Sequence, residues 1–97
     1  MDKQVVLAKL VNSAEDIRRR FRVKRLAVFG SISRGEADTR SDIDFLVSFE
    51  QAATFDLFMD LKFHLEELLG IPVDLVTDDA LRPQIRQAIQ SELIDVA

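Results

Sequence analysis

The stretch that decides the fold runs from residue 25 to residue 49 and reads RLAVFGSISRGEADTRSDIDFLVSF. Its first six residues form a β-rich run that stops at a glycine, which predicts a strand. Its last eight residues, 42–49, alternate between apolar and other side chains, which predicts a second strand with Asp42 and Asp44 on one side. The polar residues between them, 31–41, predict a loop with room for a helical turn.

The segments on either side of this stretch complete a small domain. Apolar residues at helical spacing predict amphipathic helices over residues 4–21 and 54–69. Residues 71–77, IPVDLVT, predict a third strand, and Asp78 is expected to cap a last helix that continues to about residue 95. This order predicts an α/β (α+β) fold: a small two-layer domain, with a mixed sheet of three or four strands and helices packed on one face. The helical residues expected to face the core are Val6, Leu7, Leu10, Val11, Ala14, Ile17, Phe21, Phe55, Phe58, Leu61, Leu65, Leu68, Leu69, Leu81, Ile85, Ala88, Ile89, Leu93 and Val96.

Length and composition exclude several classes of protein. A chain of 97 residues allows one domain, 1–97, and leaves no room for a second. The absence of cysteine excludes a disulfide scaffold, a thiolate nucleophile and a Cys-ligated metal. The only histidine, His64, cannot build a multi-histidine centre, and its place among helical residues predicts a surface or interface role. No apolar run is long enough to span a membrane, so we expect a cytoplasmic protein.

Charge is unevenly spread along the chain. Residues 18–25, RRRFRVKR, hold six cations and no anion, whereas the rest of the chain holds seven cations and 17 anions. Cations at the end of the first helix complement the helix dipole, and we expect this stretch to be solvated or to face a partner. A nucleic-acid-binding domain is usually basic overall, so nucleic acid is not expected as a direct ligand.

Asp42 and Asp44 are the candidate metal-binding residues of the sequence. Carboxylates two residues apart on a strand lie on the same side and repel each other, and burying them without a counter-charge is costly. Oxygen ligands of this kind suit Mg²⁺, which usually binds one or two carboxylates together with substrate phosphates. Asp42 and Asp44 therefore predict half of a Mg²⁺–phosphate site.

The other half of that site is expected before the loop. Gly30 and Ser31 end the first strand, where a glycine permits close approach and free N–H groups attract phosphate oxygens. Arg34 lies one turn further on and can add a contact to a phosphate. Asp74 is an acidic residue inside an apolar strand. If its strand neighbours that of Asp44, three carboxylates converge, which with two Mg²⁺ ions is equipment for nucleotidyl transfer.

Phe29-Gly30-Ser31, followed after ten residues by Asp42-Ile43-Asp44, resembles the pattern of the DNA polymerase beta nucleotidyltransferase superfamily. The stretch LAVFGSISRGEADTRSDIDFLV looks like its smallest branch, the minimal nucleotidyltransferases (MNT). The resemblance implies a polymerase beta-like nucleotidyltransferase fold, ATP as substrate and two Mg²⁺ ions. It assigns metal binding to Asp42, Asp44 and Asp74, with Asp74 also helping to deprotonate the attacking hydroxyl, and assigns triphosphate binding to Gly30 and Ser31.

The resemblance also implies a partner. Larger relatives carry an added domain that holds the acceptor, and these 97 residues contain none, so we expect a second protein to be the acceptor. Minimal members are commonly encoded beside a helical HEPN ribonuclease toxin, and several transfer AMP from ATP to a tyrosine of that toxin and so act as antitoxins. Two alternatives stay open: an antitoxin that neutralises by occlusion without catalysis, and a subunit that adds a nucleotide to a small molecule or an RNA end.

Overall fold

The computed structural model describes residues 2–30, 32 and 42–97. Three α-helices and a four-stranded sheet confirm the predicted α+β class. In chain order the elements are helix α1 (Lys3–Phe21), strands β1 (Val23–Phe29) and β2 (Ile43–Phe49), helix α2 (Phe55–Leu69), strand β3 (Val73–Thr77), the 3₁₀-helix η1 (Asp78–Ala80), helix α3 (Pro83–Ile89), the 3₁₀-helix η2 (Gln90–Glu92) and strand β4 (Ile94–Asp95).

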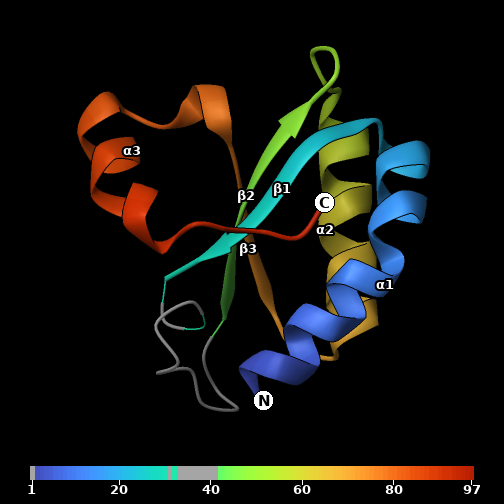
Figure 1. The fold of residues 1–97 in the computed structure, drawn as a ribbon. Helices are drawn as coiled ribbons and strands as arrows, with labels where there is room; N and C mark the ends of the chain where they lie inside the picture. Colours follow the sequence, from blue (N-terminus) through green and yellow to red (C-terminus); the bar gives the residue numbers. More distant parts are fainter. Residues whose placement is uncertain (1, 31, 33–41) are drawn as a thin grey trace.

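The sheet is mixed and has the strand order β3-β2-β1-β4. β1 pairs antiparallel with both β2 and β4, whereas β2 and β3 are parallel. A parallel pair needs a crossover connection, which α2 provides. Figure 1 shows α1 and α2 side by side on one side of the sheet and α3 on the other.

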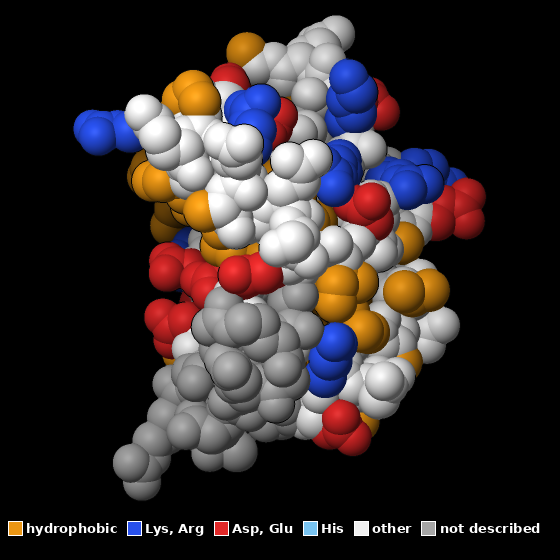
Figure 2. Space-filling model, turned by 60° about the vertical axis from the view of Figure 1, so that its left-hand side comes forward, with side chains coloured by type: hydrophobic (Ala, Val, Ile, Leu, Met, Phe, Trp, Pro, Cys, Tyr) orange, Lys and Arg blue, Asp and Glu red, His pale blue; other side chains and the backbone are white. Residues whose placement is uncertain are grey.

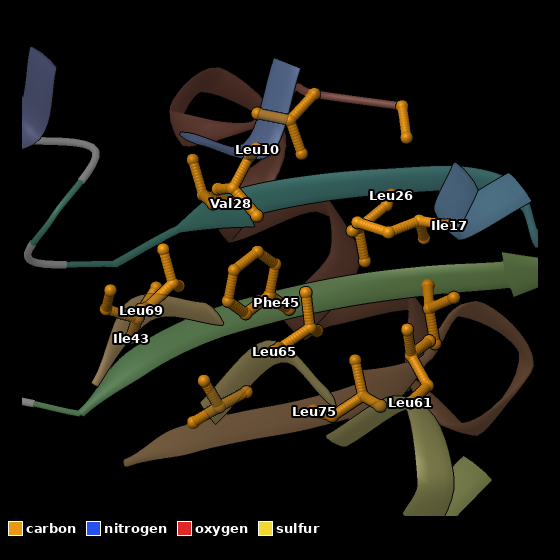
Figure 3. Packing of buried hydrophobic residues seen from close by; sticks show 14 of the residues in the cluster. Leu10, Ile17, Leu26, Val28, Ile43, Phe45, Leu61, Leu65, Leu69 and Leu75 are labelled. Atoms are coloured by element: carbon orange, nitrogen blue, oxygen red, sulfur yellow. The ribbon is translucent and has the colours of Figure 1, made fainter. Parts of the chain in front are cut away.

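The hydrophobic core lies between the sheet and the two long helices. Figure 3 shows Phe45 of β2 facing Leu65 of α2, with Leu10 and Ile17 of α1 on the β1 side. All four side chains are completely buried. The alternation predicted for residues 42–49 is confirmed, because Ile43, Phe45 and Val47 are buried in this core and the aspartates point to the opposite face.

The ends of α2 form as the sequence predicts. The Thr54 hydroxyl accepts a hydrogen bond from the backbone N–H of Leu57 at 3.1 Å, which satisfies one unpaired donor of the first turn. Gly70 ends the helix in the left-handed conformation, with φ +73°.

The α1 helix ends in the basic turn that contains Arg18, Arg19 and Arg20. In the described part of the chain, no helix combines the length and apolarity needed to cross a bilayer.

The prediction of one last helix from Asp78 to about residue 95 is wrong. Pro83 begins α3, and the residue before it, Arg82, is extended, because proline disfavours helical backbone in its predecessor. No residue of α3 is buried, and Ile85 is 48% exposed. The chain then leaves the helix and pairs with β1 as β4, so Val96 is buried by strand pairing rather than by a helical face.

Two smaller expectations also change. Phe55 and Val11 were expected in the core but are 75% and 59% exposed, which leaves the apolar stripe of each helix narrower than predicted. His64, predicted to have a surface or interface role, is half-buried. Its ring lies 5.2 Å from that of Phe21, and its Nε2 atom is buried and has no hydrogen-bond partner within the described residues.

Candidate active site

Aspartates on two neighbouring strands define the candidate site. Asp44 of β2 is the register partner of Asp74 of β3, and partners in a parallel pair project from the same face of the sheet. Asp42 lies two residues before Asp44 and therefore belongs to the same face. The predicted convergence of these carboxylates required the two strands to be neighbours. The sheet meets this condition, because β2 and β3 are paired.

The aspartates differ in their surroundings. Asp44 is half-buried, whereas Asp42 and Asp74 are exposed. The Asp74 carboxylate makes no hydrogen bond or ion pair with any described residue, so no salt bridge within the described part of the chain explains an acidic side chain inside this strand. Figure 2 shows several acidic side chains gathered on one face of the molecule.

Gly30 makes room for the Asp44 carboxylate. Its φ of +79° is a conformation that favours glycine. A Cβ built on this residue would overlap Oδ2 of Asp44 and lie 3.2 Å from its Cγ atom. Gly30 is therefore packed against Asp44 of β2. A side chain at position 30 would displace the Asp44 carboxylate.

The backbone N–H of Gly30 donates a hydrogen bond to Oε1 of Glu92 at 3.0 Å. This donor was expected to bind triphosphate, but it is engaged by a protein carboxylate in this structure. Sequence reasoning missed Glu92 because it lies 62 residues from Gly30 and was placed inside a helix. No pattern in the sequence pointed to this contact, because β4, which brings Glu92 to Gly30, has only two residues.

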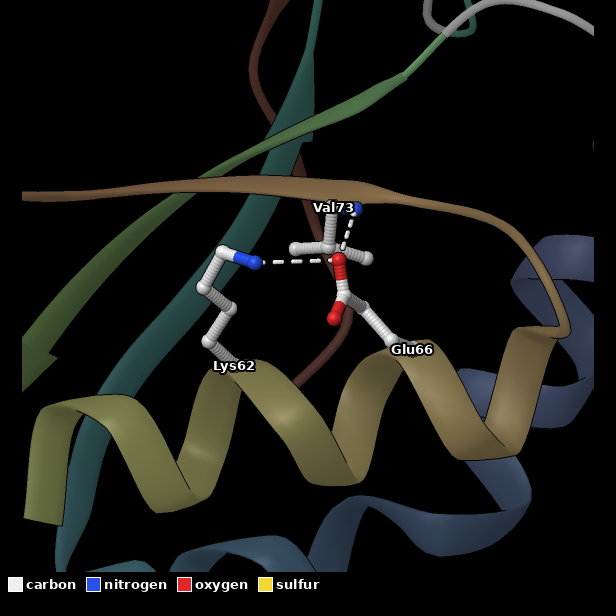
Figure 4. Close-up of polar contacts among 3 residues, drawn as sticks. All are labelled: Lys62, Glu66 and Val73. Atoms are coloured by element: carbon white, nitrogen blue, oxygen red, sulfur yellow. Dashed lines mark hydrogen bonds and ion pairs between the residues drawn. The ribbon is translucent and has the colours of Figure 1, made fainter.

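The start of β3 is fixed by an acidic residue of α2, as Figure 4 shows. The Glu66 carboxylate accepts hydrogen bonds from the Val73 backbone N–H at 2.9 Å and from Lys62 Nζ at 3.0 Å. The Val73 hydrogen bond, followed by that from Lys62, lowers the pKa of Glu66 below its ordinary value. Because Asp74 follows Val73 directly, this contact also anchors the strand that carries the third aspartate.

Two predicted site residues, Ser31 and Arg34, lie outside the described residues. Among the described residues, no group of three acidic or histidine side chains is close enough to hold a metal ion. The chemistry of the donors nevertheless fits Mg²⁺, because carboxylates on one face supply hard oxygen ligands and the remaining ligands usually come from substrate phosphates and water.

A separate open groove of about 700 Å³ lies at the opposite end of β2 and β3. Its lining includes Glu50, Thr54, Phe55 and Asp79, and it contains none of the predicted site residues. The size of this groove does not make it the active site, because the carboxylates that could bind a metal and phosphate lie at the other end of both strands.

A mixed sheet of the order β3-β2-β1-β4 with helices packed against it is the fold of a nucleotidyltransferase domain. The family profile described as "Nucleotidyltransferase domain" matches residues 10–96. Protein adenylyltransferase MntA of Thermococcus cleftensis is 42% identical over 82 residues, covering 84% of this chain and 83% of the relative. The chain therefore belongs to the nucleotidyltransferase family and is a transferase.

Solved structures agree with this assignment. A structure described as that of a minimal nucleotidyltransferase superposes with a TM-score of 0.84 at 38% identity, covering 97% of this chain and 95% of the other. The complex of a tri-AMPylated Shewanella oneidensis HEPN toxin with an MNT antitoxin gives a TM-score of 0.67 at 20% identity, covering 98% of this chain and 71% of that chain. At that identity the second comparison shows a shared fold.

Proposed function

We propose that this protein is an antitoxin that transfers AMP from ATP to a hydroxyl of a HEPN-type toxin, with a tyrosine as the expected acceptor. The observation that carries the proposal is the register pair of Asp44 and Asp74 beside the Gly30 turn. The relative named a protein adenylyltransferase supports AMP as the transferred group. The AMPylated toxin in a complex of the same fold supports a toxin as acceptor.

Asp42 and Asp44 would hold the metal, and Asp74 would complete the set. Bound Mg²⁺, expected as two ions, would neutralise the triphosphate and stabilise the charge that develops on the leaving oxygen. Gly30 contributes the space beside Asp44, since its own N–H is engaged by Glu92. Ser31 and Arg34 are proposed to bind the triphosphate.

Asp74 is proposed to take the proton from the attacking hydroxyl. A tyrosine hydroxyl has an ordinary pKa of about 10, so it needs a base within hydrogen-bond reach to attack at neutral pH. The hydroxyl oxygen forms a bond to the α-phosphorus of ATP, the bond from that phosphorus to the bridging oxygen breaks, and pyrophosphate leaves. Asp74 is exposed and has no described partner, so its carboxylate is available to the acceptor.

The proposal is tested by measuring pyrophosphate release in the presence of Mg²⁺, each nucleoside triphosphate and a HEPN-type protein sought among the products of neighbouring genes. Wild-type protein should release pyrophosphate from ATP, and Asp44→Asn should not. Asp60→Asn is the matched control, because it removes an exposed carboxylate of α2 that is remote from the site in sequence and on the opposite side of the sheet. Equal release by wild type and Asp44→Asn would refute the metal assignment.

The occlusion antitoxin predicts a different result from the same experiment. It predicts that the toxin is neutralised without nucleotide consumption, and that Asp44→Asn neutralises as well as the wild type. The subunit hypothesis predicts release that depends on a small molecule or an RNA end rather than on the toxin. The expected cellular site of the reaction is the cytoplasm.

A further inference from the structure

The contact between Glu92 and Gly30 joins the last turn of the chain to the candidate site. The Glu92 carboxylate accepts the Gly30 N–H at 3.0 Å from the 3₁₀-helix that directly precedes β4. Neither the family pattern quoted above nor the roles proposed so far give Glu92 a function. The contact nevertheless lies beside Asp44, because Gly30 packs directly against that aspartate.

The backbone holds Glu92 in this place. β4 pairs with β1 in the register Val28↔Ile94 and Ala27↔Asp95. Gly30 lies two residues after Val28, and Glu92 lies two residues before Ile94. Because the strands are antiparallel, this register places Gly30 and Glu92 opposite each other. The strand itself is secured on its far side, where Arg25 Nε lies 2.6 Å from Oδ1 of Asp95. The Glu92 side chain is therefore aimed at Gly30 by strand pairing.

The hydrogen bond to Glu92 restrains the backbone of Gly30. Glycine at positive φ has more conformational freedom to lose than any other residue, and its position decides where the Asp44 carboxylate can lie. A carboxylate that accepts a backbone N–H forms a charge-assisted hydrogen bond, which is stronger than a neutral one. Glu92 can thus fix the end of β1 beside Asp44.

We propose that Glu92 is a positioning residue for nucleotidyl transfer: its carboxylate holds the Gly30 backbone so that Asp44, which packs against Gly30, stays in its reactive position. This inference rests on the proposed function for its effect on rate. It predicts that loss of the acceptor oxygen at position 92 slows transfer more than loss of the charge alone.

The hydrogen bond itself can be tested without activity. The chain has three glycines, so selective ¹⁵N-glycine labelling gives three amide signals. Glu92→Ala should raise the exchange rate of the Gly30 amide about tenfold or more, the scale of a lost charge-assisted hydrogen bond, and leave the Gly70 amide unchanged. Ser91→Ala, an exposed neighbour in η2, is the matched control. An unchanged Gly30 amide in Glu92→Ala would overturn the inference.

Transfer kinetics test the role. Glu92→Ala should lower kcat about tenfold or more, because misplaced reacting groups react slowly, at a temperature where the variant is fully folded. Glu92→Gln keeps an oxygen acceptor and should stay within about fivefold of wild type. Equal loss in Glu92→Gln with a protected Gly30 amide would overturn positioning in favour of a role for the charge. Absence of transfer by the wild type would instead refute the proposed function, and the Gly30 amide would still decide whether Glu92 holds the glycine.

Discussion

Replacing Gly30 by alanine should damage the site far more than the fold, and Gly70 provides the matched comparison. Both glycines have positive φ, +79° and +73°, and an alanine in the left-handed region costs about 1–2 kcal/mol. A Cβ at Gly70 meets no atom within 4 Å, whereas one at Gly30 overlaps Oδ2 of Asp44. The two variants therefore share the backbone cost and differ in what happens to Asp44.

The extra cost at Gly30 falls on a side chain that can move. The overlapping atom is a terminal oxygen, so Asp44 can leave its rotamer at a cost of about 0.5–1.5 kcal/mol. Chemical denaturation should show Gly70→Ala destabilised by about 1–2 kcal/mol and Gly30→Ala by roughly 1 kcal/mol more. AMP transfer should fall about a hundredfold in Gly30→Ala, because a reacting group is displaced, and should be retained in Gly70→Ala. Similar transfer by both folded variants would refute this account of Gly30.

Further variants test other parts of the structure. Asp74→Asn should reduce the transfer rate about a hundredfold or more, as expected for a lost general base, while isothermal calorimetry shows ATP affinity retained; a lowered melting temperature with normal transfer would make Asp74 structural. Glu66 has a lowered pKa, so its stabilising contact is complete above the ordinary glutamate pKa of about 4.3 and is lost as pH falls through the lower folded value. Glu66→Gln should therefore cost about 1 kcal/mol at pH 7 and less in acid, whereas an equal cost at both pH values would exclude the charged contact with Val73. His64→Leu should raise stability by about 1 kcal/mol, because it removes a buried unpaired nitrogen beside Phe21; a loss in urea denaturation would contradict this.

The sequence predicted the parts of the fold that depend on local pattern. Alternation over residues 42–49 placed the aspartates opposite the core, and the spacing of apolar residues identified both long helices. The first strand begins at Val23, two residues before its predicted start. The prediction missed this start because the buried valine lies inside a run of cations. The Asp44–Asp74 pairing could be stated only as a condition, because one strand does not reveal its neighbour.

The C-terminal segment could not be predicted by the same reasoning. Apolar residues from Leu81 to Val96 have the spacing of a helix. In the structure, however, Ile94 and Asp95 pair with the edge of β1 that β2 leaves unpaired. A strand of two residues has no periodicity to detect, and its pairing with β1 spans most of the chain. Glu92 was missed for that reason, since its contact with Gly30 exists only once β4 is in place.

The most direct measurement is the intact mass of a HEPN-type protein, sought among the products of neighbouring genes, after incubation with ATP, Mg²⁺ and the wild-type protein. The account predicts a gain of about 329 Da, or a multiple of it, for each AMP transferred in the Mg²⁺-dependent reaction, located on a tyrosine by peptide mapping. Asp44→Asn should give no gain. An unchanged mass of a toxin that the wild-type protein nevertheless neutralises would contradict catalytic transfer.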